Sequence, residues 1–462
     1  MPRLFGRAVL VASLLLAVAG LPALADMVIE LKDGSVIRLP VQPEDLRSVT
    51  FDDGKAAEGS GAADAEAAQA EAAPAAIQAA IASGEVLAPL LPPATKPSGA
   101  TPIRVGPGRA YQVPSQAAKV ARSGDVVEIE AADYSGDVAV WKQNNLTIRG
   151  VGGRPHIDAG GNSAGGKAIW VIQGNNVTVE NVELSGCTVP DRNGAGLRLE
   201  GTNFTLRNSY IHDNQMGILS GSNRKSRILI EGSEFAHNTV DYEATGSLGH
   251  NVYIGKVRSF TLRGSYVHSA SIGHNVKSRA AQSYIVANRI MDGAEGNSSY
   301  LIDLSEGGDA YVLGNLLHKS AAADNFAMIA YATEGGKGKA DADLFVVNNT
   351  AVSDLSEAVL LRNQGNAVAT VANNIFVGGQ SVSEGPSRLS ANVTGRDAGL
   401  VDAEGYDFRL AANSPAVDAG DGGIAAEGGL LIPDLQYVAP TGLEPRPRNG
   451  AVDVGAFEAA AK

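Results

Sequence analysis

Residues 247–278 read SLGHNVYIGKVRSFTLRGSYVHSASIGHNVKS, in which Gly-His-Asn-Val occurs twice, 24 residues apart. One turn of a parallel β-solenoid has about this length, and equivalent residues of successive turns stack about 4.7–4.9 Å apart. We therefore expect the two copies to stack residue on residue, with His250 over His274, Asn251 over Asn275 and Tyr253 over Lys277. Because a solenoid does not require Gly-His-Asn to fold, the repeated motif indicates a functional surface.

The repeat continues along the chain as short segments that alternate apolar and polar residues and end in Asn or Gly. Alternation with period two is typical of half-buried strands, and a terminal Asn or Gly tolerates the positive φ of a corner. Nine such segments, at intervals of 24 to 33 residues, end at Gly150, Asn181, Asn208, Gly232, Gly264, Asn288, Asn315, Asn348 and Asn373. The unequal intervals indicate loops of different length at the turns. The pattern predicts an all-β fold, a single-stranded right-handed parallel β-helix, with the nine segments stacked as one sheet.

The two ends of the chain differ in composition from the repeats. The first residues combine a basic start, an apolar stretch and an Ala-Leu-Ala end, which is typical of a secretory signal and predicts a secreted or periplasmic protein without a stable membrane span after cleavage. We expect a signal peptide over 1–25, a small β-hairpin unit over 26–55, an Ala/Gly/Pro-rich linker over 56–100, the β-helix over 101–380 and a capping segment over 381–462. A helix over 114–122 is expected to cover the open first turn of the β-helix.

The distribution of charge suggests the kind of partner. The net charge of −13 at pH 7 argues against nucleic acid and against an anionic membrane. Residues 244–291, which contain both Gly-His-Asn copies, nevertheless lack acids and hold six Lys or Arg residues. We expect these bases to form a strip that binds an acidic, uronate-containing polysaccharide. The single cysteine, Cys187, excludes an intramolecular disulfide framework.

Period-two alternation also assigns the outward side chains next to the repeated motif. Tyr253, Lys277 and Asp303 form one outward column over three successive turns. We expect Asn251 and Asn275 to form a parallel outward column. The candidate catalytic residues are Lys277, Tyr253, His274 and Asp303, and the candidate substrate-binding residues are Arg279, Asn251, Asn275, His250, Arg198 and Glu334.

These side chains suit β-elimination from a uronate. This reaction needs a cation at the carboxylate, a base for the C5 hydrogen and an acid for the leaving oxygen. We expect neighbouring Arg279 to lower the pKa of Lys277 and so make it a usable base. Arg279 or His274 would neutralise the carboxylate, and Tyr253 would donate the proton. Two alternatives stay open: Lys277 and Asp303 form an exposed salt bridge, or Asp303 and Glu334 form a hydrolytic carboxylate pair.

No cofactor is expected from the sequence. The Cys and His spacings do not suggest zinc, and calcium bound by loop carboxylates is possible but lacks a specific motif. His212, His237 and His268 each follow an aromatic residue by two positions, which indicates a structural ladder at the turns.

Several motifs resemble those of exported bacterial β-helix proteins that degrade polysaccharides. HNVKSRA from His274 and YIVANRI from Tyr284 resemble the chondroitinase B and alginate lyase family, and YDFRLAANSPAVDAG and AVDVGAFE resemble closing segments of such proteins. The resemblance implies a pectin lyase-like fold and Lys277 as the base. The family places an assisting Arg on the next turn, where this chain has Asp303.

Two hypotheses follow from these features. The first is an exported polysaccharide-degrading enzyme with lyase activity, which the clustered Lys, Arg, His and Tyr favour. The second is a non-catalytic carbohydrate-binding or surface-attachment solenoid, which the expected N-terminal unit and linker favour. Release of an ultraviolet-absorbing unsaturated uronate distinguishes the two, because binding alone creates no double bond.

Overall fold

The computed structural model describes residues 26–30, 36–40, 101–334, 338–426 and 429–459. The chain divides into two compact units, Met1–Glu66 and Ala67–Lys462. In the first unit, β1 (Asp26–Glu30) pairs with β2 (Val36–Pro40) as an antiparallel pair, with Asp26 opposite Pro40. The expected signal peptide and linker lie outside the described residues.

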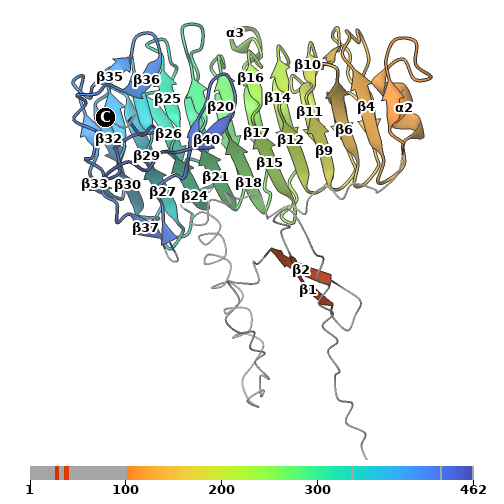
Figure 1. Ribbon diagram of the computed structural model, residues 1–462. Helices are drawn as coiled ribbons and strands as arrows, with labels where there is room; N and C mark the ends of the chain where they lie inside the picture. The colour runs from red at the N-terminus through yellow and green to blue at the C-terminus, as the bar shows by residue number, and fades with distance from the viewer. Residues whose placement is uncertain (1–25, 31–35, 41–100, 335–337, 427–428, 460–462) are drawn as a thin grey trace, which may run out of the picture. The chain divides into compact units, whose positions relative to one another are not determined.

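The second unit contains three long parallel sheets, which the chain visits in turn (Figure 1). We call them sheets I, II and III. Sheet I has twelve strands, and sheets II and III have ten each. Each strand pairs with the equivalent strands of the turns before and after it, so neighbouring strands of one sheet are one full turn apart in sequence. This arrangement is a parallel β-helix.

The strands have the following bounds. Sheet I contains β3 (Ile103–Val105), β4 (Val126–Glu130), β6 (Thr147–Val151), β9 (Val177–Glu180), β12 (Phe204–Arg207), β15 (Arg227–Glu231), β18 (Ser259–Arg263), β21 (Gln282–Val286), β24 (Asp309–Leu313), β27 (Leu344–Val347), β30 (Ala369–Ala372) and β33 (Ser387–Ser390). Sheet II contains β7 (His156–Asp158), β10 (Glu183–Ser185), β13 (Tyr210–His212), β16 (Glu234–Ala236), β19 (Tyr266–His268), β22 (Arg289–Met291), β25 (Leu316–Lys319), β28 (Thr350–Ser353), β31 (Ile375–Val377) and β34 (Val393–Thr394). Sheet III contains β5 (Ala139–Trp141), β8 (Ala168–Ile172), β11 (Ala195–Leu199), β14 (Met216–Ser220), β17 (His250–Ile254), β20 (His274–Ser278), β23 (Tyr300–Leu304), β26 (Ala327–Tyr331), β29 (Val359–Asn363) and β32 (Ser381–Glu384).

The nine repeated segments all lie in sheet I, which confirms the predicted fold. The corner residues Asn181, Asn208, Gly232 and Gly264 occupy one column and have φ between 49° and 56°. Asn and Gly suit this column because they tolerate the left-handed conformation.

The register differs from the prediction by one residue on the next two turns. There the corner residues are Ala287 and Gly314, with φ of 49° and 64°, and Asn288 and Asn315 follow them. The amide of Asn288 turns inward and donates to Asn315 Oδ1 at 3.0 Å. The same inward ladder continues through Asn349, Asn374 and Asn392. Inward amides satisfy buried backbone groups at this corner, which apolar side chains cannot do.

The segments at the two ends of the β-helix differ in structure. Helix α2 (Pro114–Val120) confirms the expected N-terminal helix and buries Pro114, Ala117 and Ala118. The C-terminal segment forms the short pairs β35 (Leu400–Asp402) with β36 (Asp407–Leu410), β37 (Ala425–Ala426) with β38 (Gly429–Leu430), and β39 (Leu435–Tyr437) with β40 (Leu443–Pro445).

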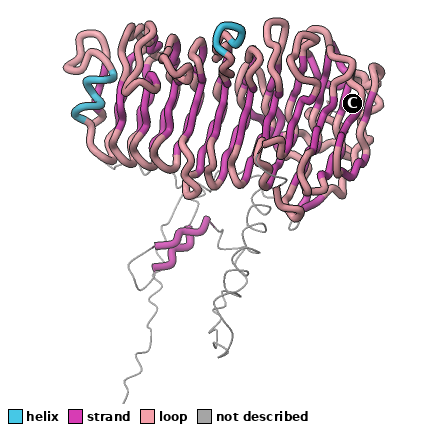
Figure 2. Tube along the Cα trace, turned by 180° about the vertical axis from the view of Figure 1, so that it is seen from behind, coloured by secondary structure: helices cyan, strands magenta, loops and turns pink. Residues whose placement is uncertain are grey.

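The C-terminal segment packs along the sides of the later turns. Ile424 and Leu431 cover outward residues of sheet I such as Tyr311 and Phe345. Phe408 packs in a separate cluster with outward residues of sheet II. The trace in Figure 2 shows the helix α3 (Tyr242–Thr245) on a loop that leads from sheet II to sheet III.

Candidate active site

The Gly-His-Asn motif lies at the start of β17 and β20 of sheet III, where the glycine comes directly before each strand and the histidine is its first residue. The geometry explains why these residues occur there. A Cβ atom on Gly273 would lie 1.5 Å from the carbonyl oxygen of Gly249, so only glycine allows the two turns to approach this closely. His250 stacks on His274 with ring centroids 4.8 Å apart, as the repeat predicted.

Asn251 and Asn275 face the interior, so the outward column predicted for them is wrong. Both are fully buried, and Asn251 Nδ2 donates to Asn275 Oδ1 at 2.9 Å and to the carbonyl oxygen of His268 at 2.7 Å. The backbone bends here between sheets II and III, and Asn251 and Val252 both turn inward. Strict alternation therefore starts only after the bend, and these amides cannot contact a polysaccharide.

The two histidines are buried and neutral. Burial, followed by the charge of Lys277, lowers the pKa of His250 to about 3, and burial also lowers the pKa of His274 well below its usual value. The backbone N–H of His274 donates to His250 Nδ1 at 3.0 Å, while His274 Nδ1 is buried without a hydrogen-bond partner among the described residues. The prediction that His274 supplies positive charge to a carboxylate is therefore wrong.

Tyr253, Lys277 and Asp303 occupy one outward column of sheet III, as predicted. Lys277 Nζ lies 3.1 Å from Asp303 Oδ2, and it also lies over the Tyr253 ring, 5.6 Å from its centroid. Lys277 is only 5% exposed and Asp303 only 1%. The pair is thus a buried ion pair and not the exposed salt bridge considered above.

A second carboxylate reaches this cluster from the residues that follow β26. Glu334 Oε1 accepts a hydrogen bond from Lys277 Nζ at 2.5 Å, and Glu334 Oε2 accepts one from Arg279. The backbone N–H of Glu334 donates to the carbonyl oxygen of Ser305, which holds this segment beside the preceding turn. One carboxylate is therefore bound between a lysine and an arginine. The Glu334 side chain is 42% exposed, so it covers the cluster from the solvent side.

The charges of the cluster determine its protonation. Burial lowers the pKa of Lys277, but Asp303 and Glu334 outweigh burial, so the pKa lies above its usual value. The expected lowering by Arg279 is wrong, because the carboxylates of the next two turns dominate. Burial raises the pKa of Asp303 despite Lys277. Burial raises the pKa of Glu334, because it disfavours the charged form. The hydrogen bonds from Lys277 and Arg279 outweigh burial and hold the pKa below its usual value.

Arg198, a candidate substrate-binding residue, lies on β11 and does not join the cluster. Arg198 and Lys277 are separated by three strand spacings of sheet III, about 14 Å along the solenoid. Arg198 lines a separate cavity of about 250 Å³ together with Glu200, Ser220, Ser222 and Asn223. Its position beside the same sheet keeps it a candidate for contact with a long ligand.

The bases of the acid-free window do not form one strip, so this prediction is wrong. Lys277 lies on sheet III, Arg263 on sheet I and Arg289 on sheet II, because one turn of a solenoid visits all three sheets. Acids from neighbouring turns pair with them. Arg263, for example, forms an ion pair with Glu231.

Two residues beside the cluster were missed in the sequence. Tyr300 stacks on His274 with centroids 5.2 Å apart, and Arg362 follows Asp303 and Ala330 in the outward column. The Arg362 guanidinium lies over the Phe326 ring, 4.9 Å from its centroid. Both residues hold strand positions equivalent to those of His274 and Lys277, so continuing the repeat to later turns would have found them.

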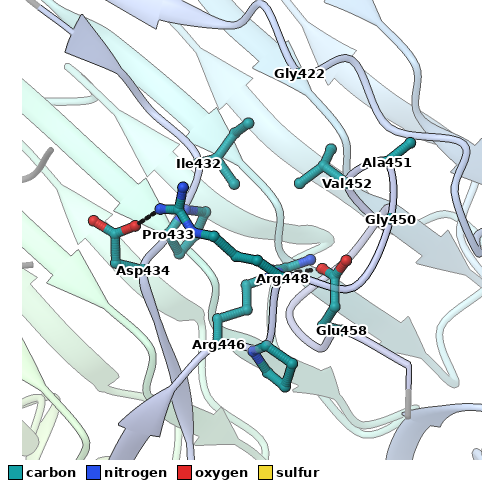
Figure 3. Close-up of a pocket in the computed structure, with 11 residues that line it drawn as sticks. Gly422, Ile432, Pro433, Asp434, Arg446, Arg448, Gly450, Ala451, Val452 and Glu458 are labelled. Carbon is teal, nitrogen blue, oxygen red and sulfur yellow. Dashed lines mark hydrogen bonds and ion pairs between the residues drawn. The ribbon is translucent and has the colours of Figure 1, made fainter. Parts of the chain in front are cut away.

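A cavity of about 380 Å³ lies in the C-terminal segment (Figure 3). Its charged residues are paired: Arg446 Nε donates to Glu458 at 2.9 Å, and Arg448 contacts Asp434. Arg446 also donates to the carbonyl oxygens of Asp453 and Gly455. These contacts hold the closing segment together, and we assign this cavity no chemistry.

Comparisons with known proteins agree with the fold. A family model described as "Right handed beta helix region" matches residues 134–317. Among solved structures, the chain is similar to pectate lyase Pel9A, with 14% identity and a TM-score of 0.55 over 78% of this chain and 97% of that one. It is also similar to an alginate lyase from Paenibacillus sp. str. FPU-7, with 15% identity and a TM-score of 0.38 over 59% of this chain and 95% of that one. No curated protein sequence gives a significant match.

The chain is a right-handed parallel β-helix, and the distant resemblance expected from its sequence holds at the level of fold. Identities of this size do not carry over an activity. Within the described residues, no helix is long and apolar enough to cross a membrane.

Proposed function

We propose that this protein is an exported enzyme that cleaves a uronate-containing polysaccharide by β-elimination on the outer face of sheet III. The observation that carries the proposal is the carboxylate of Glu334, whose two oxygens are bound by Lys277 and Arg279. A uronate carboxylate has the same charge and the same pair of oxygens. The site thus already holds a side chain in the manner in which it would hold its substrate.

The substrate carboxylate would replace Glu334. Lys277, Arg279, Asp303 and Glu334 together carry two positive and two negative charges. When Glu334 swings toward solvent, one positive charge is left unbalanced, and an incoming uronate neutralises it. Glu334 is suited to this exchange because it is the most exposed member of the cluster.

Lys277 acts as the base after it transfers its proton to Asp303. The two groups are 3.1 Å apart, and burial raises the pKa of the Asp303 carboxyl, so a bound glycan that excludes water favours the neutral pair. The Lys277 nitrogen then takes the C5 hydrogen as a proton. The C5–H electron pair forms the double bond to C4, and the C4–O bond breaks.

Tyr253 supplies the proton to the leaving oxygen. Its ring lies beside both cations, with Lys277 Nζ at 5.6 Å and Arg279 Cζ at 5.4 Å from its centroid. His274 acts as a positioning residue. Its Nδ1 atom lies 3.7 Å from Asp303 Oδ2 and can accept the hydrogen that Asp303 gains.

The geometry disfavours Asp303 and Glu334 as a hydrolytic pair. Asp303 is 1% exposed, so a sugar cannot reach its carboxylate. Glu334 would then lack the second carboxylate that glycoside hydrolysis needs.

The test is to incubate the protein with alginate, pectate and glycosaminoglycans and to follow the ultraviolet absorbance of the unsaturated uronate. Lys277→Arg keeps the positive charge and its partners, but a guanidinium does not release its proton, so we expect turnover to fall about 10²–10⁴-fold. Tyr253→Phe should also lower turnover. Lys119→Ala is the control and should leave turnover unchanged, because Lys119 is an exposed residue of α2, which packs beside β5, five strands before β20 in sheet III.

Two outcomes would refute the proposal. Binding of a uronate glycan without any unsaturated product would favour the binding module. Full turnover by Lys277→Arg would exclude Lys277 as the base. Export rests on the sequence of residues 1–25 and stays a prediction, which the N-terminus of the mature protein would test.

A further inference from the structure

A second group of polar side chains lies on sheet II, away from the site proposed above. His156 on β7, Glu183 on β10 and His212 on β13 come from three successive strands. One donor atom from each lies within 4.8 Å of the other two. Glu183 Oε1 is in the centre, 3.1 Å from His212 Nε2 and 4.0 Å from His156 Nε2.

Both imidazole rings turn the same edge toward Glu183. The opposite nitrogen of each ring faces a carboxylate: His212 Nδ1 lies 2.6 Å from Asp213 Oδ2, and His156 Nδ1 lies 3.5 Å from Asp133 Oδ1. In the structure these Nε2 atoms are hydrogen-bonded, His212 Nε2 to Glu183 Oε1 at 3.1 Å and His156 Nε2 to Ser185 Oγ at 2.8 Å. A carboxylate at Nδ1 keeps a ring hydrogen there, so a metal ion can replace these contacts and take the Nε2 lone pairs. Histidines that ligate metals are oriented in this way by carboxylates in their surroundings.

We infer that His156, Glu183 and His212 bind one divalent transition-metal ion, with Zn²⁺ as the best match. Two imidazole nitrogens and one carboxylate oxygen form a ligand set that zinc prefers, with solvent in the fourth position. Ligands of tetrahedral zinc lie about 3.4 Å apart, as metal–ligand distances near 2.1 Å require. Glu183 Oε1 lies 3.1 Å from His212 Nε2 and 4.0 Å from His156 Nε2, on either side of this value. Small side-chain rotations would therefore bring the three donor atoms to the distances that zinc requires.

The chain contains an internal comparison that separates a metal site from an ordinary ion pair. Two turns further on, Glu234 pairs with His268 at 3.2 Å, just as Glu183 pairs with His212. The strand position that His156 holds before Glu183 is held by Tyr210 before Glu234. A Glu–His pair is thus a recurring feature of sheet II. Beside Glu183, His156 supplies a third donor, and beside Glu234 the same position holds a tyrosine.

The three side chains are 13–30% exposed, so an ion can reach them from solvent. Because each ligand comes from a different turn, the ion would clamp three turns together and stabilise this part of the β-helix. The inference does not depend on the proposed reaction, which lies on sheet III.

The experiment uses the full chain without a histidine tag, freed of metal by dialysis against a chelator. Titration with ZnCl₂ in a calorimeter should show one ion bound per chain, and Zn²⁺ should raise the unfolding temperature. Glu183→Gln should abolish both effects, and Glu234→Gln, the matched control, should retain both. Asp213→Asn should weaken binding about 10–100-fold, since it removes the carboxylate behind His212.

His156→Tyr provides a variant that the fold tolerates, because Tyr210 and Tyr266 occupy the same column of sheet II. It should lose zinc binding while its metal-free unfolding temperature stays close to that of the wild type. The inference is overturned if the wild type binds no Zn²⁺ in a saturable manner. It is also overturned if Glu183→Gln or His156→Tyr binds the ion with unchanged stoichiometry and affinity.

Discussion

The buried pair of Lys277 and Asp303 makes a prediction about stability that differs from the behaviour of a surface lysine. Lys277→Met removes the ammonium and leaves Asp303, which is 1% exposed, without its cation. An uncompensated buried charge costs about 3–5 kcal/mol of the free energy of unfolding. Asp303 can instead take up a proton, which at pH 7 costs about 4 kcal/mol for a carboxyl with an ordinary pKa near 3.9. Both estimates predict a large loss at pH 7.

The stability lost by Lys277→Met should be smaller at low pH than at pH 7. In the variant the folded-state pKa of Asp303 lies above the unfolded value, so the folded state binds more protons between these two values. Stability in this window falls by about 1.4 kcal/mol for each pH unit of increase. At pH 5 the protonation cost is therefore only about 1.5 kcal/mol, and the variant should be closer to the wild type than at pH 7.

Urea unfolding followed by circular dichroism at pH 5 and pH 7 measures both effects. Lys256→Met is the control, because Lys256 is 42% exposed and its ion pair with Glu306 should contribute less than about 1 kcal/mol. The double variant Lys277→Met/Asp303→Leu should recover most of the lost stability, since it leaves no buried charge unpaired. A loss below about 1 kcal/mol at pH 7, or an equal loss at both pH values, would refute the reasoning.

Three further predictions concern other buried or exchangeable groups. Burial lowers the pKa of Lys319 to about 8, so the unfolded state binds more protons from pH 8 to about 10. In this range the wild type should gain roughly 1.4 kcal/mol per pH unit relative to Lys319→Met in urea unfolding, and parallel profiles would contradict this. Asn349→Ala interrupts the inward ladder and should cost at least about 1–3 kcal/mol in the same assay, because buried hydrogen-bonding groups lose their partner. Glu334→Gln should strengthen binding of uronate oligomers, because it frees Lys277 and Arg279 from a competing carboxylate; weaker binding in a calorimetric titration would argue against the exchange.

The sequence was sufficient to predict the β-helix. Nine alternating segments with terminal Asn or Gly predicted sheet I, and two Gly-His-Asn copies predicted that His250 lies over His274 and Tyr253 over Lys277. These predictions succeeded because strand pairing in a solenoid depends on local patterns, namely side chains of period two and corners of positive φ. Neither pattern needs knowledge of distant residues.

Side-chain direction at the corners required the tertiary structure. The bend before Val252 turns Asn251 inward, and the corner at Ala287 does the same to Asn288. Periodicity assumes a straight strand, so it fails where the chain passes from one sheet to the next. The exposed or buried state of an Asn at such a place depends on the bend and on the ladder that satisfies its amide.

The chemistry of the two sites also required the tertiary structure. The pKa of Lys277 is set by Asp303 and Glu334, which reach it from later turns through loops of unequal length. His156 and His212 are distant in sequence, yet they approach the same carboxylate because each turn returns the chain to sheet II. Charge interactions depend on distance and burial in space, and the spacing of residues along the chain does not contain either quantity.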